Sequence, residues 1–124
     1  MSYKTKADIL ASIFSYYDVN FKTLGTKALY TINDKTIAEV QFNHGHNNYH
    51  SLIVTIQNKE HGEIASNTFS FEQYLTREPC SNPHSKTIKN MYIWDDNGLD
   101  WYIVRPKNTK PIVDAIIKYI EIYT

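Results

Sequence analysis

The sequence predicts an α+β fold, in which an antiparallel sheet of five or six strands is flanked by an N-terminal and a C-terminal helix. Three observations support this fold class. Apolar residues recur at helical spacing near both ends of the chain, alternating runs fill the region between them, and an Asn-Gly pair marks a tight hairpin. Since 42% of the 124 residues are hydrophobic, we expect residues 1–124 to form a single domain with one core.

The first helix is predicted over residues 5–18. Thr5 and Asp8 resemble a capping box, in which side chains satisfy the free N–H groups at the start of a helix. Apolar residues then follow at helical spacing, namely Ile9, Leu10, Ile13, Phe14 and Tyr17. We expect this stripe to face the core.

Residues 28–32 and 36–42 predict a β-hairpin because apolar and polar residues alternate in both segments. A three-residue loop at 33–35 keeps the apolar residues on one face, whereas a one-residue slip would mix the two faces. The expected cross-strand pairs are Ala28–Val40, Tyr30–Ala38 and Ile32–Thr36.

A third strand over residues 51–57 is expected to pair with the second, with Phe42 opposite Leu52 and Val40 opposite Val54. This register also places His44 opposite His50. A turn at 59–62, a fourth strand over 63–71 and a short helix over 71–76 complete the middle of the chain.

The last hairpin is predicted from residues 91–95 and 100–105, which flank Asn97-Gly98. Asn-Gly suits a type I′ turn because both central residues of that turn need a positive φ. A C-terminal helix begins near Pro111, with an apolar stripe made of Ile112, Val113, Ile116, Ile117, Ile120 and Tyr123. We expect both terminal helices to pack on one face of the sheet.

Charge and cysteine content narrow the functional classes. Thirteen basic and thirteen acidic residues give a net charge of zero, so we expect neither binding driven by nucleic-acid phosphates nor an acidic DNA mimic. The single cysteine excludes an internal disulfide. No leader peptide or membrane-spanning run is evident, and a cytoplasmic location is expected.

Four residues in polar turns have side chains that bind zinc, namely His44, His50, Cys80 and His84. The expected register brings the two hairpin histidines together, and the other two residues have the spacing of a ligand pair. The alternative is that they are solvated loop residues. The sequence leaves both interpretations open.

The last hairpin also juxtaposes acidic residues. If Asn97 and Gly98 form the turn, Trp94 faces Trp101 and Asp95 faces Asp100, with Asp96 beside them. Facing aspartates destabilise a hairpin unless a cation meets them. Three interpretations remain for Asp95, Asp96 and Asp100: solvated carboxylates, a docking patch for a basic partner, or a divalent metal site.

Motifs of common enzyme classes are absent from the sequence. It contains no G-x-S-x-G, P-loop, H-E-x-x-H or G-x-G-x-x-G pattern, and Cys80 and His84 lack a third group to orient them. We expect no catalytic residue and no cofactor. The lysines near the last hairpin could bind single-stranded nucleic acid, but the zero net charge of the chain argues against this function.

Lysine outnumbers arginine by 11 to 2, and Ile, Asn and Tyr are abundant, as in AT-rich coding sequence. In this general character the chain resembles the small counter-defence proteins of mobile elements in low-GC Gram-positive bacteria, especially inhibitors of type II CRISPR nucleases. The resemblance implies a stoichiometric inhibitor that occupies a basic, nucleic-acid-binding surface of its target, with Asp95, Asp96 and Asp100 as the docking residues. The other class is a small enzyme or ligand-binding domain acting on a nucleotide or another small molecule.

Overall fold

The computed structural model of the chain describes residues 6–43, 51–74, 91–94, 101–104 and 108–124. Within these residues the helices are α1 (Lys6–Ser15), α2 (Phe71–Tyr74) and α3 (Lys110–Glu121). The strands are β1 (Lys22–Leu24), β2 (Lys27–Asn33), β3 (Thr36–Phe42), β4 (Ser51–Asn58), β5 (Gly62–Ser70), β6 (Met91–Trp94) and β7 (Trp101–Val104). None of the helices in these ranges is long and apolar enough to cross a lipid bilayer.

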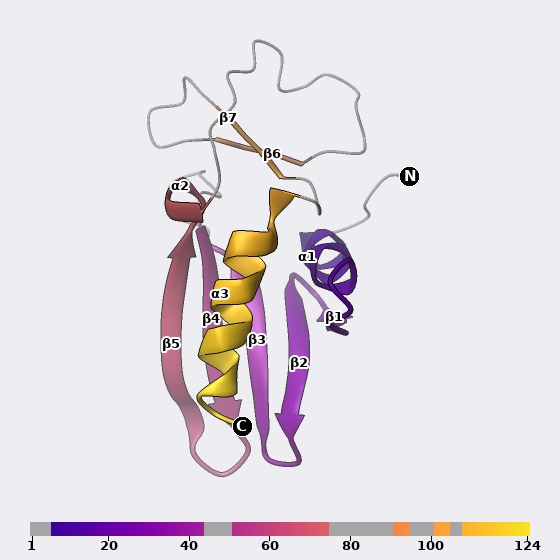
Figure 1. Ribbon diagram of the computed structural model, residues 1–124. Coiled ribbons are helices and arrows are strands. Elements are labelled where there is room, and N and C mark those ends of the chain that lie inside the picture. Colours follow the sequence, from indigo (N-terminus) through magenta and orange to yellow (C-terminus); the bar gives the residue numbers. More distant parts are fainter. Residues whose placement is uncertain (1–5, 44–50, 75–90, 95–100, 105–107) are drawn as a thin grey trace.

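Strands β1 to β5 form one antiparallel sheet in the order of the sequence, and α3 lies across one face of it (Figure 1). Helix α1 lies next to α3 and contributes to the same core. The predicted α+β class, with an N-terminal and a C-terminal helix against an antiparallel sheet, is therefore confirmed.

The strands that make up the sheet differ from the expected set. Strand β1 joins the sheet although its three residues, all exposed, show no alternation that predicts a strand. The last hairpin, in contrast, forms a separate two-stranded sheet, in which Trp94 pairs with Trp101 in the expected backbone register. Pairing with β2 defines β1, so its identity as a strand is a property of the tertiary structure.

The turn between β2 and β3 is shorter than the predicted three-residue loop at 33–35, so that prediction was wrong. Asn33, rather than Ile32, pairs with Thr36, so the turn has two residues and a register shift lies between Thr31 and Asn33. Such a bulge takes up one extra residue, which allows a tight turn without exchanging the two faces. The Lys35 N–H donates to the Asn33 side-chain Oδ1 at 2.9 Å and stabilises the turn. The pairs further along the strands are as expected: Ala28–Val40 and Tyr30–Ala38.

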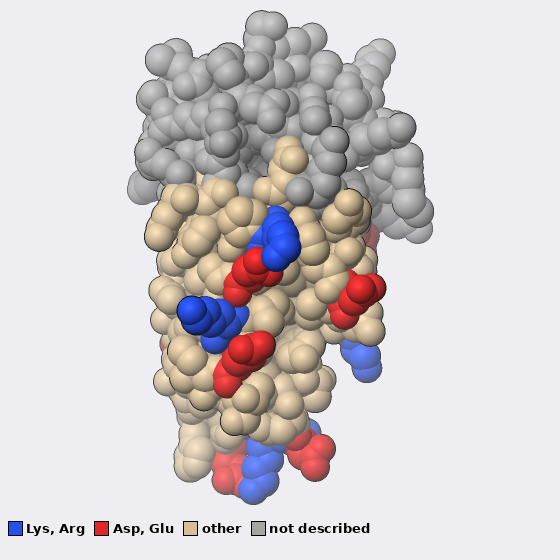
Figure 2. All heavy atoms as spheres, viewed as in Figure 1, with Lys and Arg blue, Asp and Glu red and all other residues tan. Residues whose placement is uncertain are grey.

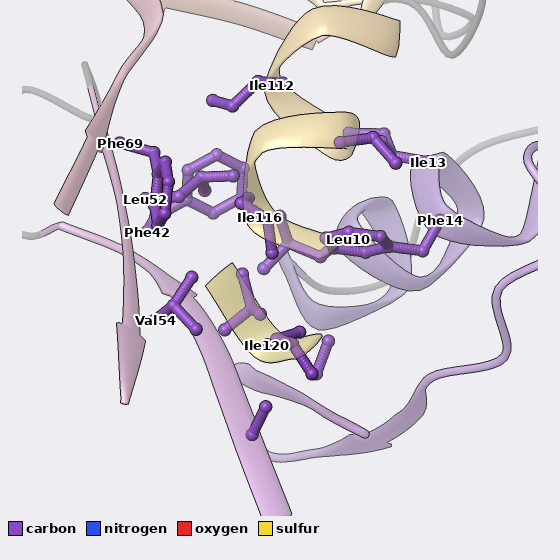
Figure 3. Packing of buried hydrophobic residues seen from close by; sticks show 14 of the residues in the cluster. Leu10, Ile13, Phe14, Phe42, Leu52, Val54, Phe69, Ile112, Ile116 and Ile120 are labelled. Carbon is purple, nitrogen blue, oxygen red and sulfur yellow. The ribbon is translucent and has the colours of Figure 1, made fainter. Parts of the chain in front are cut away.

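The expected β3–β4 register is confirmed, with Phe42 opposite Leu52 and Val40 opposite Val54. One face of the sheet packs against α1 and α3 to form the core (Figure 3). The helix residues buried there are Leu10, Ile13, Phe14, Ile112, Val113, Ile116 and Ile120. They match the predicted apolar stripes, except that Tyr17, Ile117 and Tyr123 are only partly buried, while the side chain of Ile9 lies outside the description.

Apart from the buried Ser51, the opposite face of the sheet carries a mixture of polar and apolar side chains that are half-buried or exposed, as is common for an antiparallel sheet with one wet face. Lys27 and Glu39 form an ion pair on this face, with 2.7 Å between Nζ and Oε1. The helices therefore cover one face of the described sheet, and its other face and its two edges remain accessible at the surface.

Candidate functional site

The residues for which the sequence predicts a metal site or a docking patch all lie outside the described residues. They are His44, His50, Cys80 and His84 for zinc, and Asp95, Asp96 and Asp100 for a basic partner. Both predictions therefore stay predictions. Among the residues that the structure does describe, no three His, Cys, Asp or Glu side chains come together as they would around a metal ion.

Strand β5 is an edge of the five-stranded sheet and pairs with β4 on its inner side (Figure 1). Residues 64–70 of this strand carry no ionisable side chain, and most of the strand is exposed. Natural edge strands are usually short or carry charges that discourage pairing with another chain. The other edge, β1, follows that rule because it has three residues and includes Lys22.

The hydrogen-bond pattern identifies the backbone groups of β5 that point away from the sheet. The Asn43 N–H donates to the Ser51 carbonyl at 2.9 Å, and the Lys59 N–H donates to the Lys35 carbonyl at 2.8 Å. Bonded and non-bonded pairs alternate in an antiparallel ladder, so alternate β4 residues direct their backbone groups toward β5. Those residues are Leu52, Val54 and Ile56, and their partners on β5 are Phe69, Asn67 and Ala65.

It follows that Ser66 and Thr68, which alternate with these partners, direct their N–H and C=O groups outward. A second observation supports this assignment, because the Thr68 N–H donates to Oδ1 of the adjacent Asn67 side chain at 2.9 Å rather than to a neighbouring strand. The Asn67 amide thereby occupies one outward donor in the middle of the edge. Sequence reasoning missed this surface, although the uncharged run between Glu63 and Glu72 was a usable signal.

A second surface is a groove of about 480 Å³ beside α3. It is lined by Tyr17, Val19, Val113, Asp114, Ile117, Lys118 and Glu121. The volume is within the range of small-molecule sites, roughly 300 to 1,000 Å³. Its charged lining residues are exposed, however, which suits contact with another protein surface better than enclosure of a small ligand.

The groove borders a charged stripe on α3, visible as alternating blue and red side chains in Figure 2. Within the stripe, the Lys110 Nζ donates to the Asp114 Oδ2 at 2.7 Å. This hydrogen bond and the negative charge of Asp114 raise the pKa of Lys110. Both side chains are well exposed, so the pair adds little to stability.

Tyr119 on α3 belongs to an aromatic cluster. Its ring centroid lies 5.8 Å from that of Phe69 and 5.5 Å from that of Tyr123. Burial, followed by a hydrogen bond with Tyr123, raises the pKa of Tyr119 to about 12. Because the unfolded chain ionises a tyrosine near pH 10, it loses the proton first as the pH rises. The contribution of Tyr119 to stability is therefore complete below about pH 10 and decreases toward about pH 12.

We expect Tyr119→Phe to make thermal stability less sensitive to alkali. Melting temperatures measured at several pH values from about 9 to 12 would fall more steeply for the wild type than for this variant, because Phe has no proton to lose. Tyr16→Phe is the matched control, since Tyr16 is 58% exposed, and it should keep the wild-type slope. Equal slopes for Tyr119→Phe and the wild type would contradict the raised pKa.

The described residues thus present two surfaces without an assigned role, the outer edge of β5 and the groove with its charged stripe on α3. Both are positioned by the same core, since β5 and α3 each bury residues in it. Comparison of the chain with protein-family models, with curated proteins and with solved structures found no match.

Proposed function

We propose that this chain is a protein-binding inhibitor that works without catalysis and binds an extended segment of its target along the outer edge of β5. The observation that supports the proposal is the outward backbone of Ser66, together with the outward carbonyl of Thr68, within the uncharged and largely exposed residues 64–68 of an edge strand. A segment added there would form a sixth strand. In such complexes, main-chain hydrogen bonds provide affinity and alternate side-chain contacts provide specificity.

The two faces of the edge define the chemistry of the bound segment. On the helix-covered face the edge contains Ala65, the exposed Asn67 and Phe69, and Phe69 packs near Tyr74 with 6.4 Å between ring centroids. On the opposite face it contains the hydroxyl groups of Ser66 and Thr68. Side chains of an added strand alternate between the same two faces. The segment should therefore place apolar side chains beside Ala65 and Phe69, a polar side chain beside Asn67, and polar side chains on the other face.

The target that we propose is a bacterial defence nuclease of the type II CRISPR class, with a mobile element as the source of the inhibitor. The general resemblance of the chain to counter-defence proteins supports this target. In the proposal, Asp95, Asp96 and Asp100 dock on the basic surface with which the nuclease binds nucleic acid. The zero net charge favours local docking of this kind over wholesale imitation of DNA.

The experiment is an inhibition assay with several type II CRISPR nucleases, each tested free and loaded with guide RNA. Ser66→Pro removes an outward N–H while leaving the β4–β5 ladder intact, because the Ser66 amide does not face β4. Ser66→Ala removes the hydroxyl but keeps that N–H. We expect Ser66→Pro to weaken inhibition by about tenfold through one lost hydrogen bond and a steric clash, and Ser66→Ala to inhibit like the wild type.

Thermal melts of both variants establish that they are folded. Equal inhibition by Ser66→Pro and Ser66→Ala would remove β5 from the mechanism. A third variant that changes Asp95, Asp96 and Asp100 together to lysine should abolish inhibition, and full inhibition by it would remove that patch. Absence of inhibition by the wild type across the nucleases would contradict the proposed target.

A further inference from the structure

The charged stripe on α3 consists of Lys110, Asp114, Lys118 and Glu121, all of them exposed. Their signs alternate along the helix, and Figure 2 shows the alternation on the outer surface of α3. Neighbours in the stripe are three or four residues apart and so lie about 4.5 to 6 Å apart along the helix axis. One ion pair within the stripe, Lys110–Asp114, is formed in the structure.

The charges of the stripe match those of a second copy of the same helix when the two helices run in opposite directions, because each positive residue then faces a negative one. In an antiparallel pair centred near Ile116, Lys110 faces Glu121 of the second copy, and Asp114 faces Lys118 of the second copy. The same two contacts recur on the other side of the two-fold axis. Residue i meets residue j and j meets i, which is the geometry of an isologous dimer interface.

The groove beside the stripe gives a second copy apolar surface to cover. Its lining includes the half-buried Val19 and Ile117 above the buried Val113, and its charged rim belongs to the same stripe. A helix laid along the stripe therefore also covers the groove. The burial of apolar surface would stabilise the contact, while the charges would select the antiparallel orientation.

We propose that the stripe and groove of α3 bind a second copy of this chain, with the two α3 helices antiparallel. The inference does not depend on the proposed inhibitor function, because it uses exposed side chains of α3 and not the outward backbone groups of β5. A contact centred on two helices is smaller than the roughly 800 Å² per partner of a standard stable interface. We therefore expect a weak dimer, with a dissociation constant of about 0.1 mM.

The test is sedimentation equilibrium over a range of protein concentrations up to about five times that dissociation constant. The wild type should associate as a dimer, and Asp114→Lys and Lys118→Asp should each raise the dissociation constant at least about tenfold. Each reversal places two pairs of like charges against each other in a homodimer. An equimolar mixture of the two variants should associate like the wild type, since the mixed pair restores both attractions.

Recovery by mixing distinguishes an interface from a change in helix stability, because an effect within one helix would persist in the mixture. The mixture of Asp114→Lys with Lys59→Asp is the matched control, as Lys59 is exposed in the β4–β5 turn and its reversal gives the same net charge as Lys118→Asp. In this mixture only two Lys59→Asp chains can pair with every attraction in place, so it should associate more weakly than the mixture of Asp114→Lys with Lys118→Asp. A wild type that remains monomeric at the highest concentration, or equal association by both mixtures, would overturn the proposal.

Discussion

Replacing Phe42 with alanine is expected to lower the free energy of unfolding by about 3 to 5 kcal/mol. Phe42 is 1% exposed at the end of β3, opposite Leu52. Its ring centroid lies 6.3 Å from that of Phe71, the first residue of α2. The truncation would remove buried apolar surface and leave a cavity where the sheet meets α2. Urea and thermal unfolding should both detect the loss, with a fall in melting temperature of roughly 10 to 20 °C.

Leu24→Ala is the control for this substitution, because Leu24 is 66% exposed and its truncation should change stability by no more than about 0.5 kcal/mol. The double variant Phe42→Ala/Phe71→Ala should lose about 0.5 to 1.5 kcal/mol less than the sum of the single changes, since each single change already breaks the contact. A melting temperature for Phe42→Ala equal to that of the wild type would contradict the packing of α2 against the end of β3.

Ile116→Ala is expected to cost about 2 to 5 kcal/mol. Ile116 is fully buried, and Figure 3 shows it on the side of α3 that faces the sheet and α1. Most of the stability of a short helix in a protein comes from packing of this kind rather than from helix propensity. The substitution should therefore weaken the attachment of the whole helix, which chemical denaturation and the loss of amide exchange protection over α3 would measure.

Ile122→Ala provides a control of the same residue type at the end of the same helix. Ile122 is 70% exposed, so its truncation should change the free energy of unfolding by less than about 0.5 kcal/mol. Similar effects of the two substitutions would mean that α3 does not dock through the face that includes Ile116.

Alternation and helical spacing were sufficient to predict the central register and the two terminal helices. Side chains on a strand alternate between two faces, so only one choice of register keeps all the apolar residues of both strands on one face. In that antiparallel register Val40 lies opposite Val54 and Phe42 lies opposite Leu52. The buried residues of α3 likewise recur every three or four positions. In these elements the order of apolar and polar residues along the chain already determines which side chains the hydrophobic effect buries.

The tertiary structure decided the features that depend on neighbouring strands. Strand β1 exists because β2 lies beside it, and the bulge before Asn33 reconciles a two-residue turn with the buried face. The outward backbone of Ser66 and Thr68 has the same origin. Every non-proline residue carries the same N–H and C=O groups, so no residue type marks which of them remain outside the ladder. Only the assembled sheet makes β5 an edge, and this is why the candidate binding surface emerged from the structure.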